Sequence, residues 1–119
     1  TISYGQLSEG TYKGVDEDEN DCKVEVNLDE GKTFFELDFY VKDKLIFTSK
    51  HREKNLNSWL EHNGHFKQEV IKEALLGKKL YEVRINQEEA NIDSFIIIRW
   101  RFLAGSSWAT PFYKLKCYI

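Results

Sequence analysis

The chain has 119 residues, of which 41% are hydrophobic and 14% aromatic, and its formal net charge is −3. This length and composition exclude a disordered chain and indicate one globular domain, residues 1–119, with a core of its own. No segment approaches the roughly 20 apolar residues of a membrane-spanning helix, so we expect no membrane span. The sequence pI of about 5.6 argues against a nucleic-acid partner, because nucleic-acid readers carry a clear basic footprint.

Alternation of apolar and polar residues predicts strands in the first part of the chain. The clearest strand covers 33–41, where Phe35, Leu37 and Phe39 share one face. The polar connection at 29–32 contains Gly31, which is typical of a hairpin. The strands predicted in this part cover residues 10–15, 22–28, 33–41 and 44–49.

The centre of the chain changes its period and predicts a helix. Apolar residues at helical spacing are Phe66, Val70, Ile71, Ala74 and Leu75. Asn63 is a candidate N-cap, and Gly77 stands where a helix commonly ends. We therefore expect one helix over 65–76, between the fourth and fifth strands.

Alternation then resumes and predicts further strands over residues 80–86, 94–103 and 108–118. Tyr81, Val83 and Ile85 share a face of the first of these strands. In the second, we expect Ile98 and Trp100 to point into the core. Pro111 cannot donate a ladder hydrogen bond, so it predicts an edge position or a bulge in the last strand.

These elements predict a mainly β protein of the α+β class. A strongly bent antiparallel sheet, or a small β-barrel of about seven strands with the helix between strands four and five, accommodates them most simply. We expect a monomer. The same alternation fits a closed barrel and a split sandwich equally well.

The two cysteines, Cys22 and Cys117, both fall on the inward face of a predicted strand. We expect them to form a disulfide bond between the two ends of the domain. The chain contains no methionine and begins at Thr1, which fits removal of a secretory signal peptide. A secreted or periplasmic location follows as the expectation, because disulfides persist in oxidising compartments. The alternative is a trimmed cytosolic domain with two buried thiols.

Two groups of carboxylates are candidate sites. Asp16, Asp18 and Asp21 belong to an acidic turn that could stabilise the fold through calcium, although the spacing does not fit an EF-hand loop. Glu36 and Asp38 share a strand face at a separation that a hydrolase could use together with a histidine. Ion pairing of these two carboxylates with Arg99 and Arg101 is the simpler interpretation. We expect no cofactor.

Aromatic side chains at loop edges are the clearest sign of a functional surface. Trp59 and Trp108 adjoin polar loop residues, and Phe112 follows Trp108 in the last predicted strand. Such residues commonly anchor a bound partner. The sequence therefore predicts a non-catalytic, exported binding module that recognises a protein or a small amphipathic ligand through Trp59, Trp108 and Phe112. The alternatives are the hydrolase and the calcium-stabilised domain.

Overall fold

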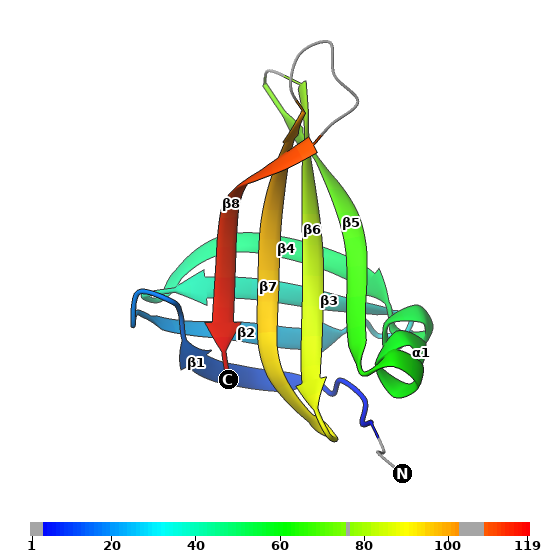
Figure 1. The fold of residues 1–119 in the computed structure, drawn as a ribbon. Helices are drawn as coiled ribbons and strands as arrows, with labels where there is room; N and C mark the ends of the chain where they lie inside the picture. Colours follow the sequence, from blue (N-terminus) through cyan, green and yellow to red (C-terminus); the bar gives the residue numbers. More distant parts are fainter. Residues whose placement is uncertain (1–3, 76, 103–108) are drawn as a thin grey trace.

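The structure is a computed structural model that describes residues 4–75, 77–102 and 109–119. Eight antiparallel strands and one helix are formed in these residues (Figure 1). They are β1 (Gly10–Val15), β2 (Asp21–Leu28), β3 (Phe34–Val41), β4 (Lys44–Arg52), α1 (Glu53–Asn63), β5 (His65–Ala74), β6 (Gly77–Glu88), β7 (Asn91–Phe102) and β8 (Ala109–Tyr118).

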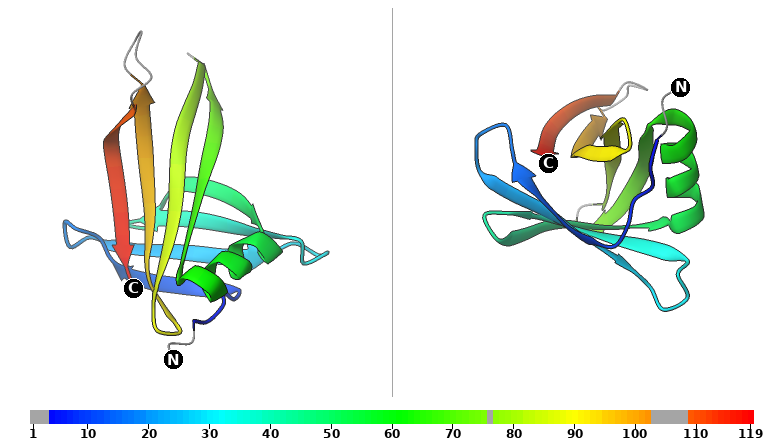
Figure 2. Two further views of the ribbon diagram at one scale, coloured as in Figure 1. Left: turned by 45° about the vertical axis from the view of Figure 1, so that its right-hand side comes forward. Right: turned by 90° about the horizontal axis from the view of Figure 1, so that it is seen from below.

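The strands form one antiparallel sheet in the order β4-β3-β2-β1-β8-β7-β6-β5. Strands β1–β4 cross β5–β8 steeply, so the sheet curls into a nearly closed barrel (Figures 1 and 2). The two halves are joined in the sheet by one register pair, Val15 with Tyr118. The predicted mainly β, strongly bent antiparallel fold with one helix between strands four and five is thus confirmed, with eight strands in place of seven.

The predicted position of the helix is wrong. Residues 65–74 form β5, which pairs with β6 from His65 opposite Asn86 to Ala74 opposite Gly77. The helix lies earlier, and Gly64 ends it with a left-handed φ of 75° and an N–H bond to the Leu60 oxygen. Phe66 and Val70 fit both structures, because a spacing of four places residues on one face of a strand as well as of a helix.

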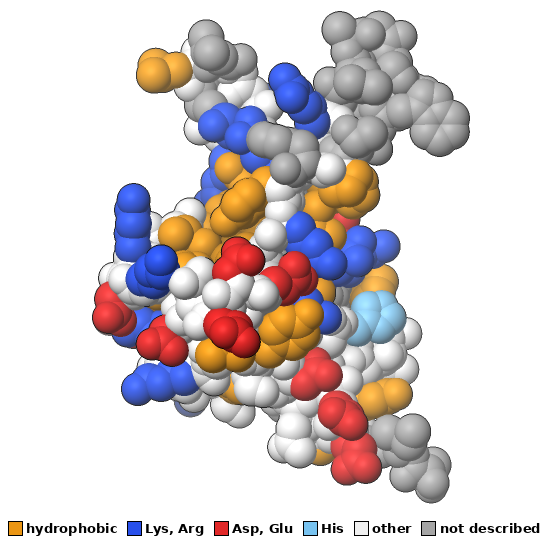
Figure 3. Space-filling model, turned by 60° about the vertical axis from the view of Figure 1, so that its left-hand side comes forward, with side chains coloured by type: hydrophobic (Ala, Val, Ile, Leu, Met, Phe, Trp, Pro, Cys, Tyr) orange, Lys and Arg blue, Asp and Glu red, His pale blue; other side chains and the backbone are white. Residues whose placement is uncertain are grey.

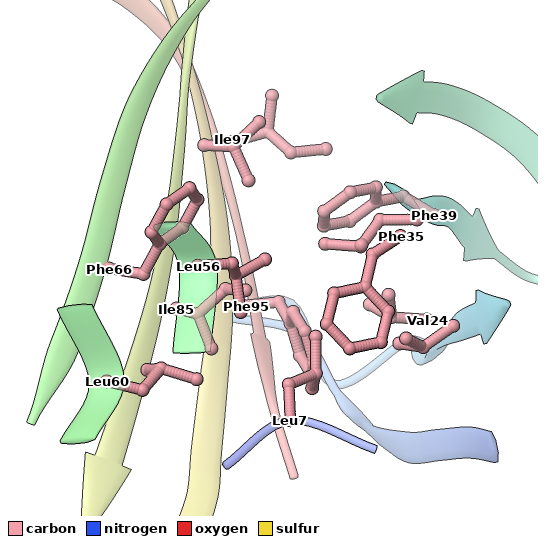
Figure 4. Packing of buried hydrophobic residues seen from close by; sticks show 13 residues of the cluster. Leu7, Val24, Phe35, Phe39, Leu56, Leu60, Phe66, Ile85, Phe95 and Ile97 are labelled. Carbon is pink, nitrogen blue, oxygen red and sulfur yellow. The ribbon is translucent and has the colours of Figure 1, made fainter. Parts of the chain in front are cut away.

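The core lies between the two halves of the sheet, and Figure 4 shows its side chains converging from both. Phe35, Leu37 and Phe39 are the predicted inward face of β3, and each is at most 1% exposed. Leu56 and Leu60 reach the same core from α1. Leu7 covers its lower end, where the Asn57 side chain accepts the Leu7 N–H at 2.8 Å.

The predicted inward face of β7 is also wrong. Phe95 and Ile97 join the core, whereas Ile98 and Trp100 lie on the opposite face. Trp100 is half-buried there and donates its indole N–H to Glu82 at 2.9 Å. Residues 95–98 are apolar on both faces, so alternation alone could not identify the inner one.

The disulfide between Cys22 and Cys117 is confirmed, with Sγ atoms 2.06 Å apart and Cα atoms 6.0 Å apart. It links β2 to β8 across β1, at the corner where the halves of the sheet meet. The backbone is crowded at this corner, because a Cβ atom on Gly14 would lie 1.7 Å from the Tyr118 carbonyl oxygen. Glycine therefore permits the close approach of β1 and β8.

Strands β4 and β5 are the two ends of the sheet order, and side chains close the seam between them. Nδ1 of His51 lies 2.5 Å from Oε1 of Gln68 on β5. The Lys72 ammonium donates to the carbonyl oxygen of Thr48. Helix α1 packs against both strands beside this seam (Figure 2).

Candidate ligand-binding site

A cleft of about 270 Å³ lies above the core, where β6, β7 and β8 continue beyond their crossing with β4. Ile46 and Phe47 of β4 form one side of the cleft. The other side comes from the inner face of the long strands, and its lining residues are Tyr81, Ile97, Arg99 and Tyr113.

Strand register places the polar side chains of the cleft in one row. Tyr81 of β6 pairs with Arg99 of β7, and Arg99 pairs with Tyr113 of β8. Directly opposed residues on neighbouring strands point to the same face. A cation therefore stands between two phenols, one row above the core residue Ile97.

Phe47 provides an aromatic wall opposite this row. Its ring centroid lies 4.7 Å from that of Tyr81 and 5.9 Å from that of Phe39 in the core. The Lys72 ammonium lies 5.1 Å from the centre of the Phe47 ring. These contacts hold the ring in place, so the apolar side of the cleft is formed before any ligand arrives.

The polar part of the cleft lining is one guanidinium and two phenols. Arg99 is the one charged residue among the six described residues that line it. Burial raises the pKa of Tyr113, and the neighbouring Tyr81 and Asp16 raise it further. The Tyr113 phenol therefore keeps its proton at neutral pH and can donate a hydrogen bond.

Two of the predicted ligand-binding residues, Trp59 and Phe112, belong to the described part of the chain, and they lie on different elements. Trp59 lies on α1, is 42% exposed, and meets the His65 ring at a centroid distance of 6.1 Å. Phe112 belongs to the opposite end of the long strands, at the irregularity where Pro111 and Tyr113 flank it. Trp108 lies outside the described residues. Their binding roles stay predictions.

Pro111 does mark a bulge, as its missing N–H predicts, because the β7–β8 register shifts between Arg99 and Trp100. The sequence analysis did not identify the residues that line the cleft. Tyr81, Arg99 and Tyr113 are far apart in sequence and become neighbours only through strand pairing. The one available signal in the sequence is Arg99, a charged residue in the most apolar predicted strand, and ion pairing is the simpler interpretation of it.

The carboxylates proposed for a hydrolase are not near a histidine. Glu36 stands opposite Lys50, and Asp38 accepts a hydrogen bond from the Thr48 hydroxyl at 2.9 Å. They lie on the outer face of β3, whereas His51 of β4 is buried inside. Strand pairing places Arg99 between Tyr81 and Tyr113, and Arg101 opposite Thr110, so neither arginine stands opposite Glu36 or Asp38 in the sheet.

Ser49 and His51 are arranged like a catalytic nucleophile and its general base. Nε2 of His51 lies 2.8 Å from the Ser49 hydroxyl, and Nδ1 bonds the Gln68 side chain. Ser49 and His51 are each only 1% exposed, so no substrate reaches the hydroxyl. Burial also lowers the pKa of His51, although its bond to Gln68 opposes this and Lys72 adds to it. We interpret the cluster as the polar closure of the seam.

The acidic turn is organised by its own hydrogen bonds. Oδ1 of Asp16 accepts the backbone N–H groups of Asp18 at 2.9 Å and Asn20 at 2.8 Å. These bonds lower the pKa of Asp16, with the Asn20 backbone contributing most. Across the described parts of the chain, no three His, Cys, Asp or Glu side chains are grouped so that they could hold a metal ion.

Another hollow, of about 320 Å³, lies near the disulfide corner. It is lined by charged residues of both signs, among them Lys13, Lys23, Asp21 and Asp43. Its two lysines and two aspartates carry opposite charges in equal number.

Comparisons of the chain with protein-family models, with curated proteins and with solved structures find no match. In the described residues, no helix has the length and apolar character needed to cross a membrane.

Proposed function

We propose that this chain is a non-catalytic binding module for a small amphipathic anion. The apolar part of the ligand packs against Phe47, Tyr81 and Tyr113. Its carboxylate, sulfate or phosphate group meets the Arg99 guanidinium and the Tyr113 hydroxyl. The observation that carries the proposal is the Tyr81–Arg99–Tyr113 row in a cleft that Phe47 also lines, with the Phe47 ring in contact with Tyr81.

The volume of the cleft limits the size of the ligand. Pockets that enclose a drug-sized molecule measure about 300–1,000 Å³, so a cleft of 270 Å³ suits a ligand near the small end of that class. A protein partner would contact a wider surface than this cleft offers.

An exported location is part of the proposal. The disulfide closes a long loop and is buried, with Cys22 and Cys117 only 5% and 1% exposed. Such bonds are characteristic of secreted and periplasmic proteins. The buried disulfide and the β fold are compatible with an extracellular site of action.

Two fluorescent probes of nearly the same shape test the proposal. Anilinonaphthalene sulfonate is anionic, and N-phenylnaphthylamine is its neutral counterpart. We expect Arg99→Gln to weaken binding of the anionic probe roughly ten- to hundredfold, since a hydrogen bond to a charged group contributes about 1.5–3 kcal/mol. Phe47→Ala should weaken both probes.

Arg52→Gln is the matched control, because Arg52 is an exposed arginine of β4 whose guanidinium lies over the Phe34 ring. It should leave both affinities unchanged. Equal losses for the two probes in Arg99→Gln would contradict a role for the guanidinium in anion recognition. No loss in Phe47→Ala would place the ligand elsewhere.

A further inference from the structure

The hairpin formed by β5 and β6 projects beyond the barrel (Figure 1). It carries exposed apolar side chains. Leu75 at its turn is fully exposed, and Ile71 on β5 is 62% exposed. They are the two most exposed large hydrophobic residues among those that the structure describes. A fully exposed leucine at the tip of a projection is available for contact with a partner.

The geometry of the turn keeps Leu75 at the tip. Ala74 pairs with Gly77, so the connection between the strands is as short as a hairpin allows. Gly77 has a φ of 115°, which is accessible to glycine and strained for other residues. Hairpin turns are usually polar, and an apolar residue at such a tight turn cannot fold back onto the core of its own chain.

Cations surround the base of this tip. A groove of about 530 Å³ runs beside it, and its charged lining residues are Lys78, Lys79, Arg99, Arg101 and Glu69. One further acid, Glu73, stands opposite Lys78 in the hairpin. On the face drawn in Figure 3, Lys and Arg side chains cover the described part of the projecting end, and Asp and Glu side chains lie lower. The projecting end is thus cationic in a chain whose net charge is −3.

Trp100 adds an amphipathic side chain to the same groove. Its indole N–H is bonded to Glu82 and the residue is half-buried. Leu75 at the tip, Lys78 and Lys79 behind it, and the Trp100 indole farther back match the successive layers of a membrane interface. A nucleic acid would use the cations but would leave the exposed Leu75 without a role.

We propose that the β5–β6 hairpin docks on an anionic lipid membrane. Leu75 enters the boundary between head groups and acyl chains, and Lys78 and Lys79 contact the lipid phosphates. Arg99 lines both the groove and the ligand cleft, so docking brings the mouth of the cleft to the lipid surface. The docking itself does not depend on the cleft holding a ligand.

Co-sedimentation of the full chain with vesicles tests this proposal. We expect binding to vesicles of phosphatidylcholine mixed with phosphatidylglycerol and much weaker binding to phosphatidylcholine alone. Lys78→Gln with Lys79→Gln should weaken binding about thirtyfold, at roughly fivefold for each cation lost near an anionic surface. Leu75→Ser should weaken it about tenfold or more, because a fully exposed leucine loses its apolar burial.

Matched control variants exist elsewhere on the chain. Leu45→Ser removes a 51% exposed leucine from β4, and Lys13→Gln with Lys50→Gln removes two exposed lysines from β1 and β4. These variants should bind vesicles as the parent chain does. Circular dichroism and thermal melting of every variant separate loss of binding from loss of folding.

Three results would overturn the proposal. The first is a failure of the parent chain to sediment with anionic vesicles. The second is a loss in the Leu45→Ser control equal to that in Leu75→Ser, which would indicate nonspecific adsorption. The third is binding to single-stranded DNA or heparin that matches vesicle binding and is insensitive to Leu75→Ser, which would indicate a polyanion site.

Discussion

Breaking the bond between Cys22 and Cys117 tests how the barrel is held closed. The bond links β2 to β8, whose halves of the sheet otherwise share one register pair, Val15 with Tyr118. Its sequence separation is 95 residues. In the chain-entropy model, a link across a loop of this length raises the free energy of unfolding by about 4.7 kcal/mol. That is a large part of the roughly 5–15 kcal/mol that stabilises a typical domain.

Urea unfolding, followed by tryptophan fluorescence and circular dichroism, measures the effect. The samples are the oxidised chain, the same chain reduced while denatured, and the Cys22→Ala/Cys117→Ala variant. We expect the reduced chain and the variant each to lose about 4–5 kcal/mol. With a urea slope of about 1–3 kcal/mol per M, the midpoint should fall by roughly 1–5 M.

The reduced chain keeps both sulfur atoms and so isolates the covalent link from the packing. A loss below about 1 kcal/mol in the reduced chain would refute the reasoning, because closure would then rest on the core and not on the bond. A loss confined to the alanine variant would assign the effect to the buried sulfur atoms, since shortening a core side chain leaves a cavity.

Further predictions concern the corner, the seam and the helix. Gly14→Ala should cost at least about 3 kcal/mol in urea unfolding, since its Cβ would meet the neighbouring strand's backbone; an unchanged midpoint would contradict this close approach. Because burial lowers the pKa of His51, only the unfolded chain gains this proton just below about pH 6.5. Stability should therefore fall as the pH drops from about 6.5 toward the lowered folded pKa, by up to about 1.4 kcal/mol per pH unit, and His51→Gln should remove that slope. An unaltered slope in this variant would assign the pH dependence to other groups. Leu56→Ala should cost about 2–5 kcal/mol, whereas Trp59→Ala on the same helix should cost less than half as much; equal losses would show that Trp59 is part of the core.

Much of the fold could be predicted because strands with one buried face have a clear period. The alternation over 33–41 gave the inward face of β3, and the turn at Lys42 and Asp43 joins it to β4 with φ values of 50° and 62°. Both residues have the positive φ typical of tight hairpins. The same alternation predicted that Cys22 and Cys117 both point inward, and from this the disulfide that the structure confirms.

The candidate cleft could not be predicted, because it depends on contacts between distant strands. No local pattern relates Tyr81 to Arg99 or Tyr113, which are aligned by pairing within β6, β7 and β8. Phe47 comes from the other half of the sheet, so its place depends on how the halves cross. The sequence alone therefore indicates neither the phenols beside Arg99 nor the nearby Phe47 ring.

Sequence by itself determined the strand-rich character of this protein, the inward cysteines and most of the strand positions, because each depends on neighbouring residues with a period of two. Only the tertiary structure decided which face of residues 95–98 is inside and that residues 65–74 form a strand and not a helix. Residues 65–74 fit the period of a helix as well as that of a strand. Residues 95–98 are apolar on both faces of their strand. The choice between them is made by the strands that pair with them and by the core that those strands bury.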